Sequence, residues 1–287
     1  MIFMIFIAIF LAIAVIGFGY SAYLDLRYTE FPDWLPYSII IVSVISRIAY
    51  HVSLTGLTIA TAYSIIPMAV TGLVFLGFGL LLYYMGQWGD GDAWLLGGMG
   101  FLFPDSGGLL VETGGIAFPF VIIFNFFIVS LVYMIGYSLI LGMRKKEINK
   151  EFVRTLKKNR IRIELMIAAF FALFMGLSSY MYFFRGIPPA LSTFLFPFFI
   201  SFMIIFFYYG KAVEKKAFKK QIDVKDLREG DVIMDGKWVG VTSTDIKKLQ
   251  KKGGKIWIKE GVRFAPVFII TILVTLLLGN VIMFVMF

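Results

Sequence analysis

Two aspartates lie at the ends of long apolar runs, where a charged side chain is energetically expensive. Asp25 closes the first apolar run, and Asp92 follows the glycine-rich stretch after Tyr84. Acids at such positions usually face a wet cavity, a charged partner or a reaction centre. Two neighbouring carboxyl groups do not ionise together, and such a pair can activate water and protonate a leaving amine. The two aspartates therefore predict acid-base hydrolysis of an amide bond, provided that the fold brings them together.

Each acid also has a structural interpretation. Asp25 can flank or cap a helix at the membrane interface, and Asp92 can cap the helix that follows it by accepting backbone N–H groups. Asp90 is two residues from Asp92, so on a helix it would face another direction, and we interpret it as mainly non-catalytic. Glu30 and Asp33 are typical of a solvated loop, with Asp33 also placed to cap the next helix.

The composition places these acids in a membrane protein. Of 287 residues, 60% are hydrophobic and 16% are charged, which is far more apolar than a soluble domain. The absence of cysteine excludes structural disulfides, thiolate zinc sites and a cysteine nucleophile. His51 is the only histidine and cannot make a metal site alone, so we expect no metal and no cofactor. The first apolar run is too long, and too poor in basic residues before it, for a cleaved signal peptide.

Seven apolar stretches have about the length of a membrane crossing and an eighth is shorter, so the predicted fold class is an all-α polytopic membrane protein with at least six transmembrane helices. The fourth stretch has only about a dozen residues, or about 18 Å of helix, so it either thins the bilayer or continues through Leu109 and Leu110. The eight stretches are Ile2–Leu24, Trp34–Tyr50, Ile59–Tyr84, Asp92–Phe103, Ile116–Leu141, Ile161–Phe184, Pro188–Tyr209 and Phe264–Phe287.

The distribution of basic residues favours eight crossings. If Asp92 is cytoplasmic, 25 of the 27 lysines and arginines lie inside, and only Arg47 and Arg185 lie outside. This asymmetry is what the positive-inside rule predicts. The net charge of +9 is thus better explained by topology and lipid contact than by nucleic-acid binding.

We predict five parts along the chain. They are a membrane core with both acids at 1–143, a basic amphipathic segment at 144–160, two further transmembrane helices at 161–210, a small cytoplasmic α+β module at 211–263 and a last transmembrane helix at 264–287. In the module, a helix is predicted over Thr244–Lys252 and a tight turn at Asp235-Gly236. Strands are predicted over Asp231–Met234, Trp238–Thr242 and Lys255–Lys259.

The residues around the two acids form two recognisable motifs. They are Asp25-x-Arg27-x-x-x-Phe31-Pro32-Asp33 and Gly89-x-Gly91-Asp92. Together they resemble the signatures of the prepilin and archaeal preflagellin peptidases, a family of membrane GxGD aspartic proteases, over about Gly17 to Gly100. The resemblance implies that Asp25 and Asp92 are the catalytic acids. The other motif residues expected to pack the site are Gly89, Gly91, Arg27 and Pro32.

The chain departs from the family pattern at two positions. Trp94 replaces the lysine that commonly lies two residues after the GxGD acid, and Phe31 replaces an aliphatic residue before the proline. Bacterial members carry a cysteine-rich loop and an N-methyltransferase activity, and a chain without cysteine lacks that loop. The segment 211–287 is similar to the C-terminal region of archaeal members, so the resemblance favours the archaeal, peptidase-only branch.

The function implied is an aspartic endopeptidase at the cytoplasmic face of the cell membrane. Its protein partner would be a pilin or archaellin precursor, from which it removes a short basic leader. Independently of the family, the charges of Glu30, Asp33 and Asp90 beside the two acids predict a negative local field, which would attract that leader.

Three alternatives remain open at the level of sequence. Paired membrane acids also occur in proton-coupled transporters, and the chain can be a non-enzymatic scaffold for a surface filament. The third alternative is a presenilin-type intramembrane protease, because Pro189-Ala190-Leu191 spells the PAL motif of that family. We interpret this tripeptide as a coincidence, since Tyr23 and Asp25 are separated by Leu24 and lie in the first span rather than a late one.

Overall fold

A computed structural model describes residues 2–106, 111–188, 191–227, 231–233, 241–259, 261–281 and 283. The chain forms two compact units, which we describe separately. The first unit takes Met1–Tyr133, Gly236–Thr242 and Glu260–Phe287, and the second takes Met134–Asp235 and Ser243–Lys259.

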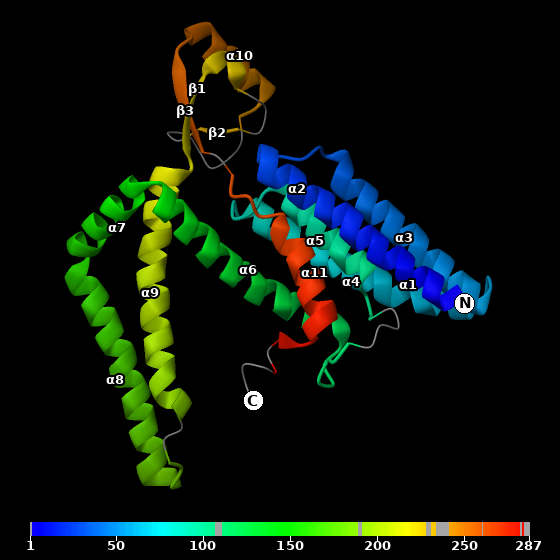
Figure 1. The fold of residues 1–287 in the computed structure, drawn as a ribbon, viewed down its shortest axis with the longest axis horizontal. Helices are drawn as coiled ribbons and strands as arrows, with labels where there is room; N and C mark the ends of the chain where they lie inside the picture. The colour runs from blue at the N-terminus through cyan, green and yellow to red at the C-terminus, as the bar shows by residue number, and fades with distance from the viewer. Residues whose placement is uncertain are drawn as a thin grey trace. The chain divides into compact units, whose positions relative to one another are not determined.

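The first unit is a bundle of helices (Figure 1). Its first span is continuous: α1 (Ile2–Ile13), a π-helical turn η1 (Ala14–Phe18) and α2 (Gly19–Tyr28) follow without a break. The other helices are α3 (Trp34–Thr55), α4 (Ile59–Tyr84), α5 (Asp90–Leu102), α11 (Pro266–Leu278) and the part of α6 (Phe118–Arg144) that precedes Met134.

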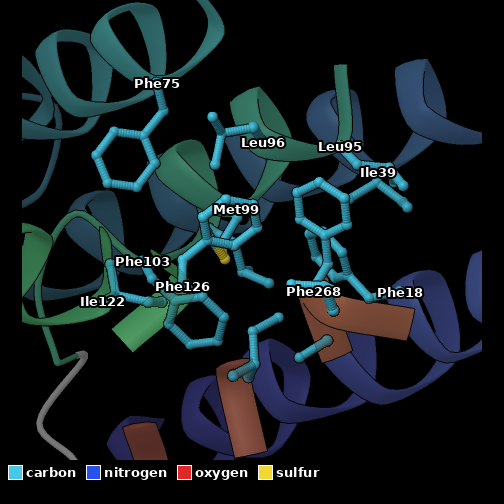
Figure 2. Close-up of a cluster of buried hydrophobic side chains, with 14 of the residues drawn as sticks. Phe18, Ile39, Phe75, Leu95, Leu96, Met99, Phe103, Ile122, Phe126 and Phe268 are labelled. Carbon is cyan, nitrogen blue, oxygen red and sulfur yellow. The ribbon is translucent and has the colours of Figure 1, made fainter. Parts of the chain in front are cut away.

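Helix α5 is the buried centre of this unit. Leu95, Leu96 and Met99 have no exposed surface, and they lie among aromatic side chains that include Phe126 and Phe268 (Figure 2). Helix α5 packs against α3, α4 and α11, so protein covers it on several sides. A helix enclosed in this way does not have to match the thickness of the bilayer, and the fourth crossing by these thirteen residues stays a prediction.

Glycines bring α4 and α5 into close antiparallel contact. A Cβ added at Gly79 would lie 2.8 Å from backbone atoms of Ala93, and one added at Gly100 would lie 2.9 Å from the carbonyl oxygen of Thr71. Small residues allow this approach of two backbones, as they do in membrane helix packing generally. The start of α5 therefore lies beside the end of α4, and α5 runs back along it.

Six of the predicted crossings are confirmed as helices long and apolar enough to span a membrane. They are Ile2–Tyr28, Trp34–Thr55, Ile59–Tyr84, Phe118–Arg144, Arg160–Arg185 and Leu195–Ala217. These helices show that the chain has the fold of an all-α polytopic membrane protein. Helix α5 ends at Leu102 and does not continue over 103–106; Leu109 and Leu110 lie outside the described residues.

The last predicted span is corrected by the structure. Instead of one helix over Phe264–Phe287, α11 ends at Leu278 because Gly279 has a φ of +69°, in the left-handed region. The amide of Asn280 then donates to the carbonyl oxygen of Glu112 at 2.8 Å, and a Cβ at residue 279 would collide with that same oxygen. A tertiary contact with a distant loop thus interrupts an apolar run that hydropathy predicts as continuous.

The second unit contains the rest of α6, then α7 (Lys146–Lys158), α8 (Arg160–Arg185) and α9 (Leu191–Ala217). Strands β1 (Lys219–Asp223), β2 (Val232–Ile233) and β3 (Lys255–Lys259) form an antiparallel sheet in the order β1-β3-β2. A 3-10 turn, η2 (Val224–Asp226), and α10 (Ser243–Lys252) complete the unit.

The predicted elements of the 211–263 segment are found in part. Strand β3 coincides with its prediction, α10 begins one residue earlier than predicted, and β2 covers the middle of the predicted Asp231–Met234. The turn at Asp235-Gly236 and most of the predicted Trp238–Thr242 strand lie outside the described residues. Strand β1 was not predicted, because KKQID has too little apolar alternation to indicate a strand. Residues 211–217 continue α9, and the small cytoplasmic α+β module over 211–263 stays a prediction.

Candidate active site

Asp25 lies near the end of α2 and is buried, with 4% of its surface exposed. Its Oδ2 accepts a hydrogen bond from the backbone N–H of Ala265 at 2.8 Å, and the N–H of Phe264 also donates to the carboxylate. These amides lie at the start of α11, where a helix has unpaired N–H groups and a positive dipole end. Asp25 therefore holds the N-terminus of a helix about 240 residues later in the chain.

Asp92 lies in the first turn of α5 and is partly exposed. It is not the N-cap of that helix, because Gly89 occupies the N-cap position and Asp92 is the third helical residue. The backbone N–H of Gly89 donates to the Asp92 carboxylate, the contact that an acid at this position makes in a capping box. The capping interpretation therefore holds in one respect only. Asp92 accepts a backbone N–H at the start of its own helix, but it does so from the first turn and not from the N-cap position.

The fold brings the two acids together. Asp25 at the end of α2 and Asp92 at the start of α5 are close enough for their charges to interact. Because α4 and α5 are antiparallel, the start of α5 lies at the end of the bundle where α4 finishes. One buried and one partly exposed carboxyl group therefore share one site.

Arg263 is a site residue that sequence reasoning missed. Its positive charge acts on Asp25, and its Nε donates to the Thr29 hydroxyl at 3.3 Å. The Tyr133 hydroxyl donates to the Arg263 carbonyl oxygen at 2.6 Å, which ties the segment before α11 to α6. No local sequence signal pairs Arg263 with Asp25, although its place just before an apolar run makes it a candidate for a helix-end position.

Arg27 was expected to pack the site, but its side chain contacts two tyrosines of α2. Its guanidinium donates to the Tyr23 hydroxyl at 2.5 Å and lies 5.2 Å from the centroid of the Tyr28 ring. The side chain is exposed and turned toward these tyrosines. Arg263, and not Arg27, is thus the cation whose charge acts on Asp25.

The two motifs meet at Gly91. A Cβ at this position would lie 2.5 Å from the ring of Phe31, the residue that departs from the family pattern, so the ring fits only against a glycine. Gly89 is less constrained, since the nearest atom to an added Cβ would be Oδ2 of Asp92 at 3.3 Å. Pro32 is exposed, and its carbonyl oxygen accepts from the amide of Leu35 at 3.0 Å as α3 begins.

The other acids predicted near the site are exposed. The Trp94 indole donates to Asp90 Oδ1 at 3.1 Å. The rings of Trp94 and Tyr37 pack edge to face, with their centroids 4.7 Å apart. Asp33 and Asp90 both act electrostatically on the Tyr37 hydroxyl. Asp33 occupies the N-cap position of α3 but makes no side-chain capping hydrogen bond. Glu30 lies in the loop just before.

Comparison with known proteins adds no identification. No family model, no curated protein and no solved structure matches this chain. Within the part of the chain that the structure describes, no group of three or more His, Asp or Glu side chains is placed to hold a metal ion. The groups that the described residues bring to the site are two carboxyl groups, the backbone amides that donate to them and the Arg263 guanidinium.

Proposed function

We propose that this protein is a membrane-embedded aspartic endopeptidase. The observation that carries the proposal is the meeting of Asp25 and Asp92 at one end of the helical bundle. Such a pair holds one shared proton, so that one carboxylate activates water while the other group protonates the leaving amine. We assign the base role to Asp25, because backbone N–H groups and Arg263 stabilise its negative charge. Asp92 then carries the shared proton and faces the substrate from its partly exposed position.

The proposed substrate is a protein precursor with a short basic leader before a hydrophobic helix, such as a pilin or archaellin precursor. The exposed acids Glu30, Asp33 and Asp90 favour a cationic leader. Because these acids are exposed, each close pair of opposite charges contributes at most about 1 kcal/mol, and salt screens it further. We further propose that the site faces the cytoplasm of the cell membrane and that the enzyme lacks methyltransferase activity, as the resemblance to archaeal members implies.

A proton-coupled transporter is supported less well. Paired acids that relay protons across a membrane lie along the path through it. Asp25 instead lies at the end of α2, bonded to the first amides of α11, and Asp92 lies in the first turn of α5.

The test is cleavage of a candidate precursor by the purified, detergent-solubilised protein, read as a leader-sized loss of mass. Asp25→Asn and Asp92→Asn should each lower the cleavage rate by more than about 100-fold, since both acids take part in the same step. Asp90→Asn is the matched control, because this acid binds Trp94 instead of facing the pair, and it should retain most activity. Near-normal cleavage by either of the first two variants contradicts the proposal.

A further inference from the structure

The basic segment of the second unit is a well-anchored helix. The inner face of α7 packs on α8 and α9: Ile148 is fully buried, and Phe152 and Leu156 contact the cluster around Ile163 and Ile204. Glu151 pairs with Lys215 of α9, and the hydrogen bond from Lys215 keeps the pKa of that carboxyl below its usual value. The outer face of α7 and its final turn therefore have a fixed position.

At the corner where α7 ends and α8 begins, a hollow of about 500 Å³ opens to the outside. Four cationic side chains line it together with Asn159 and three apolar residues of α8: Lys157, Lys158, Arg160, Arg162, Ile161, Leu165 and Met166. Arg160 pairs with Glu164 at 2.7 Å. Among the described residues, none forms a hydrogen bond or ion pair with the side chains of Lys157, Lys158 or Arg162.

Of the two arginines at the start of α8, Arg160 has a counter-charge in Glu164, whereas Arg162 has no ion-pair partner among the described residues. Arg160 and Arg162 lie in the first turn of α8, where the dipole end is positive and cations are disfavoured. Asn159 does not cap these amides, because its side chain donates back to the carbonyl oxygen of Thr155 at 2.9 Å. First-turn amides that lack a cap and neighbouring cations together form a site that favours an anion.

We propose that this corner binds the phosphate of an anionic membrane lipid. The cations and the first amides of α8 would take the phosphate, and Ile161, Leu165 and Met166 would contact the start of the acyl chains. A lipid is favoured over free phosphate because these three side chains are exposed and α8 is a candidate membrane span beginning at Arg160. The inference concerns the second unit alone and does not rest on the proposed peptidase function.

The test is a titration of the full-length protein with phosphatidylglycerol in detergent, followed by native mass spectrometry. The triple variant Lys157→Gln, Lys158→Gln and Arg162→Gln should bind the lipid about tenfold more weakly or worse, since each cation near a lipid surface contributes. The matched control is Lys247→Gln, Lys248→Gln and Lys251→Gln, which removes the same charge from exposed positions on α10 and should change binding less than about twofold.

A second variant separates lipid from free phosphate. Leu165→Asn keeps every charge but removes an exposed apolar contact, so it should weaken phosphatidylglycerol binding and leave melting temperature unchanged. If both triple variants bound phosphatidylglycerol equally weakly, the proposal would be overturned. Lipid binding would then depend on the overall charge of the chain and not on this corner. Displacement of the lipid by millimolar inorganic phosphate, or unchanged binding by Leu165→Asn, would also contradict it and indicate a simple phosphate site.

Discussion

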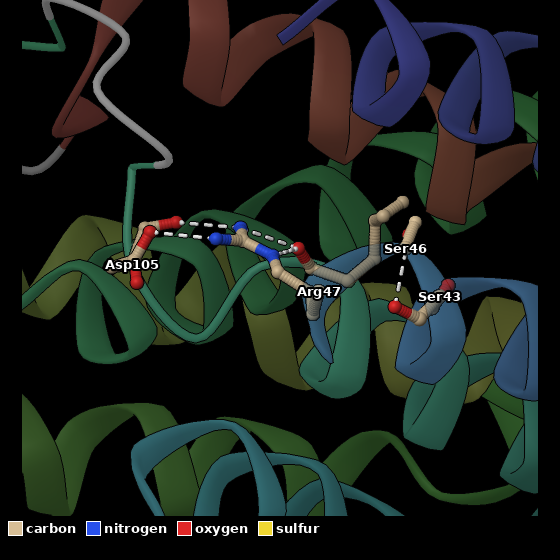
Figure 3. A network of polar contacts seen from close by, with 5 residues as sticks. Ser43, Ser46, Arg47 and Asp105 are labelled. Carbon is tan, nitrogen blue, oxygen red and sulfur yellow. Dashed lines mark hydrogen bonds and ion pairs between the residues drawn. The ribbon is translucent and has the colours of Figure 1, made fainter. Parts of the chain in front are cut away.

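The two ends of helix α5 differ in the charges that surround them. At the C-terminal end, Arg47 is fully buried. Its Nε and Nη2 atoms donate to the carbonyl oxygen of Leu102 at 2.8 and 2.6 Å. Its Nη1 atom forms an ion pair with Asp105 at 2.9 Å (Figure 3). Its guanidinium also lies 4.1 Å from the centroid of the Phe10 ring. A cation at the negative end of a helix, with an acid beside it, is a complete structural arrangement.

At the N-terminal end, the charges are of the same sign. Asp25 and Asp92 both accept backbone amides at helix starts, as the dipole favours, but they also repel each other. Asp25 accepts the amides before α11 and Asp92 accepts the Gly89 amide of its own helix, but placing both carboxyl groups at one site sets like charges against each other. Opposite charges thus meet at the C-terminal end of α5, whereas two acids lie together at its N-terminal end, where we propose the active site.

The largest expected effect separates activity from stability at the acid pair. Asp92→Asn should lower the cleavage rate by more than about 100-fold yet leave the melting temperature unchanged or raised, because the amide stays neutral beside Asp25 without having to hold a proton. Cleavage of a precursor and thermal unfolding in detergent measure the two quantities on one preparation. A large loss of stability would show that Asp92 is structural.

At the C-terminal end of α5, removal of an acid should lower stability and leave cleavage unchanged. Asp105→Ala leaves the buried Arg47 without its carboxylate partner and should lower the free energy of unfolding by about 2–3 kcal/mol. The expected loss is moderate because the Asp105 side chain is half exposed and water replaces part of the interaction. Cleavage per folded molecule should stay near normal, and an unchanged unfolding free energy would contradict the structural role of the pair.

Gly91→Ala tests the contact that joins the two motifs. The added Cβ would fall 2.5 Å from the Phe31 ring, so the ring must move at a cost of about 1–3 kcal/mol, with a parallel loss of cleavage. Gly77→Ala is the control, because an added Cβ there meets nothing within 4 Å, and helix propensity alone should stabilise it slightly. Equal unfolding temperatures for the two variants would exclude the predicted clash.

Arg263→Gln removes the cation that acts on Asp25. Losing one partly screened charge should lower kcat by about tenfold, with KM little changed, and Arg263→Lys should restore most of the rate. Arg27→Gln should have a much smaller effect, since Arg27 is turned toward Tyr23 and Tyr28. A greater loss from Arg27→Gln would reverse these roles.

The smallest effect concerns the exposed acids. Neutralising Glu30 or Asp33 should raise KM severalfold for a leader rich in Lys or Arg without changing kcat, the pattern of lost uniform binding. The attraction is between exposed charges, so raising the salt concentration should reduce the difference from the unmodified protein. A KM that is independent of salt in the unmodified protein would indicate that both acids are only solvated loop residues.

Several features of this protein were predictable because they depend on local composition. Runs of apolar residues indicated the six long helices, since the bilayer requires a fixed length of apolar helix. The expense of a carboxylate in such a run singled out Asp25 and Asp92 as candidates. Their motif spacing also placed Asp90 outside the pair, where the structure finds it bonded to Trp94.

Other features depend on contacts between residues far apart in the chain. In the sequence, Arg47 counted only as one of the two basic residues that are not on the cytoplasmic side, and its partners Leu102 and Asp105 are more than fifty residues away. Arg263 and the amide of Ala265 reach Asp25 across about 240 residues. The break in the last apolar run likewise depends on Glu112, a contact that hydropathy cannot detect.

The sequence by itself determined that the chain crosses a membrane several times and that two acids lie where charge is expensive. Only the tertiary structure decided that these acids meet, that Asp25 holds the start of α11, and that α5 is enclosed by protein instead of lipid. The physical reason is that two properties depend on each segment separately: the length of its apolar run and the free-energy cost of a charge within that run. The partner of a buried charge, in contrast, is fixed by which helix ends the packing brings to the same place.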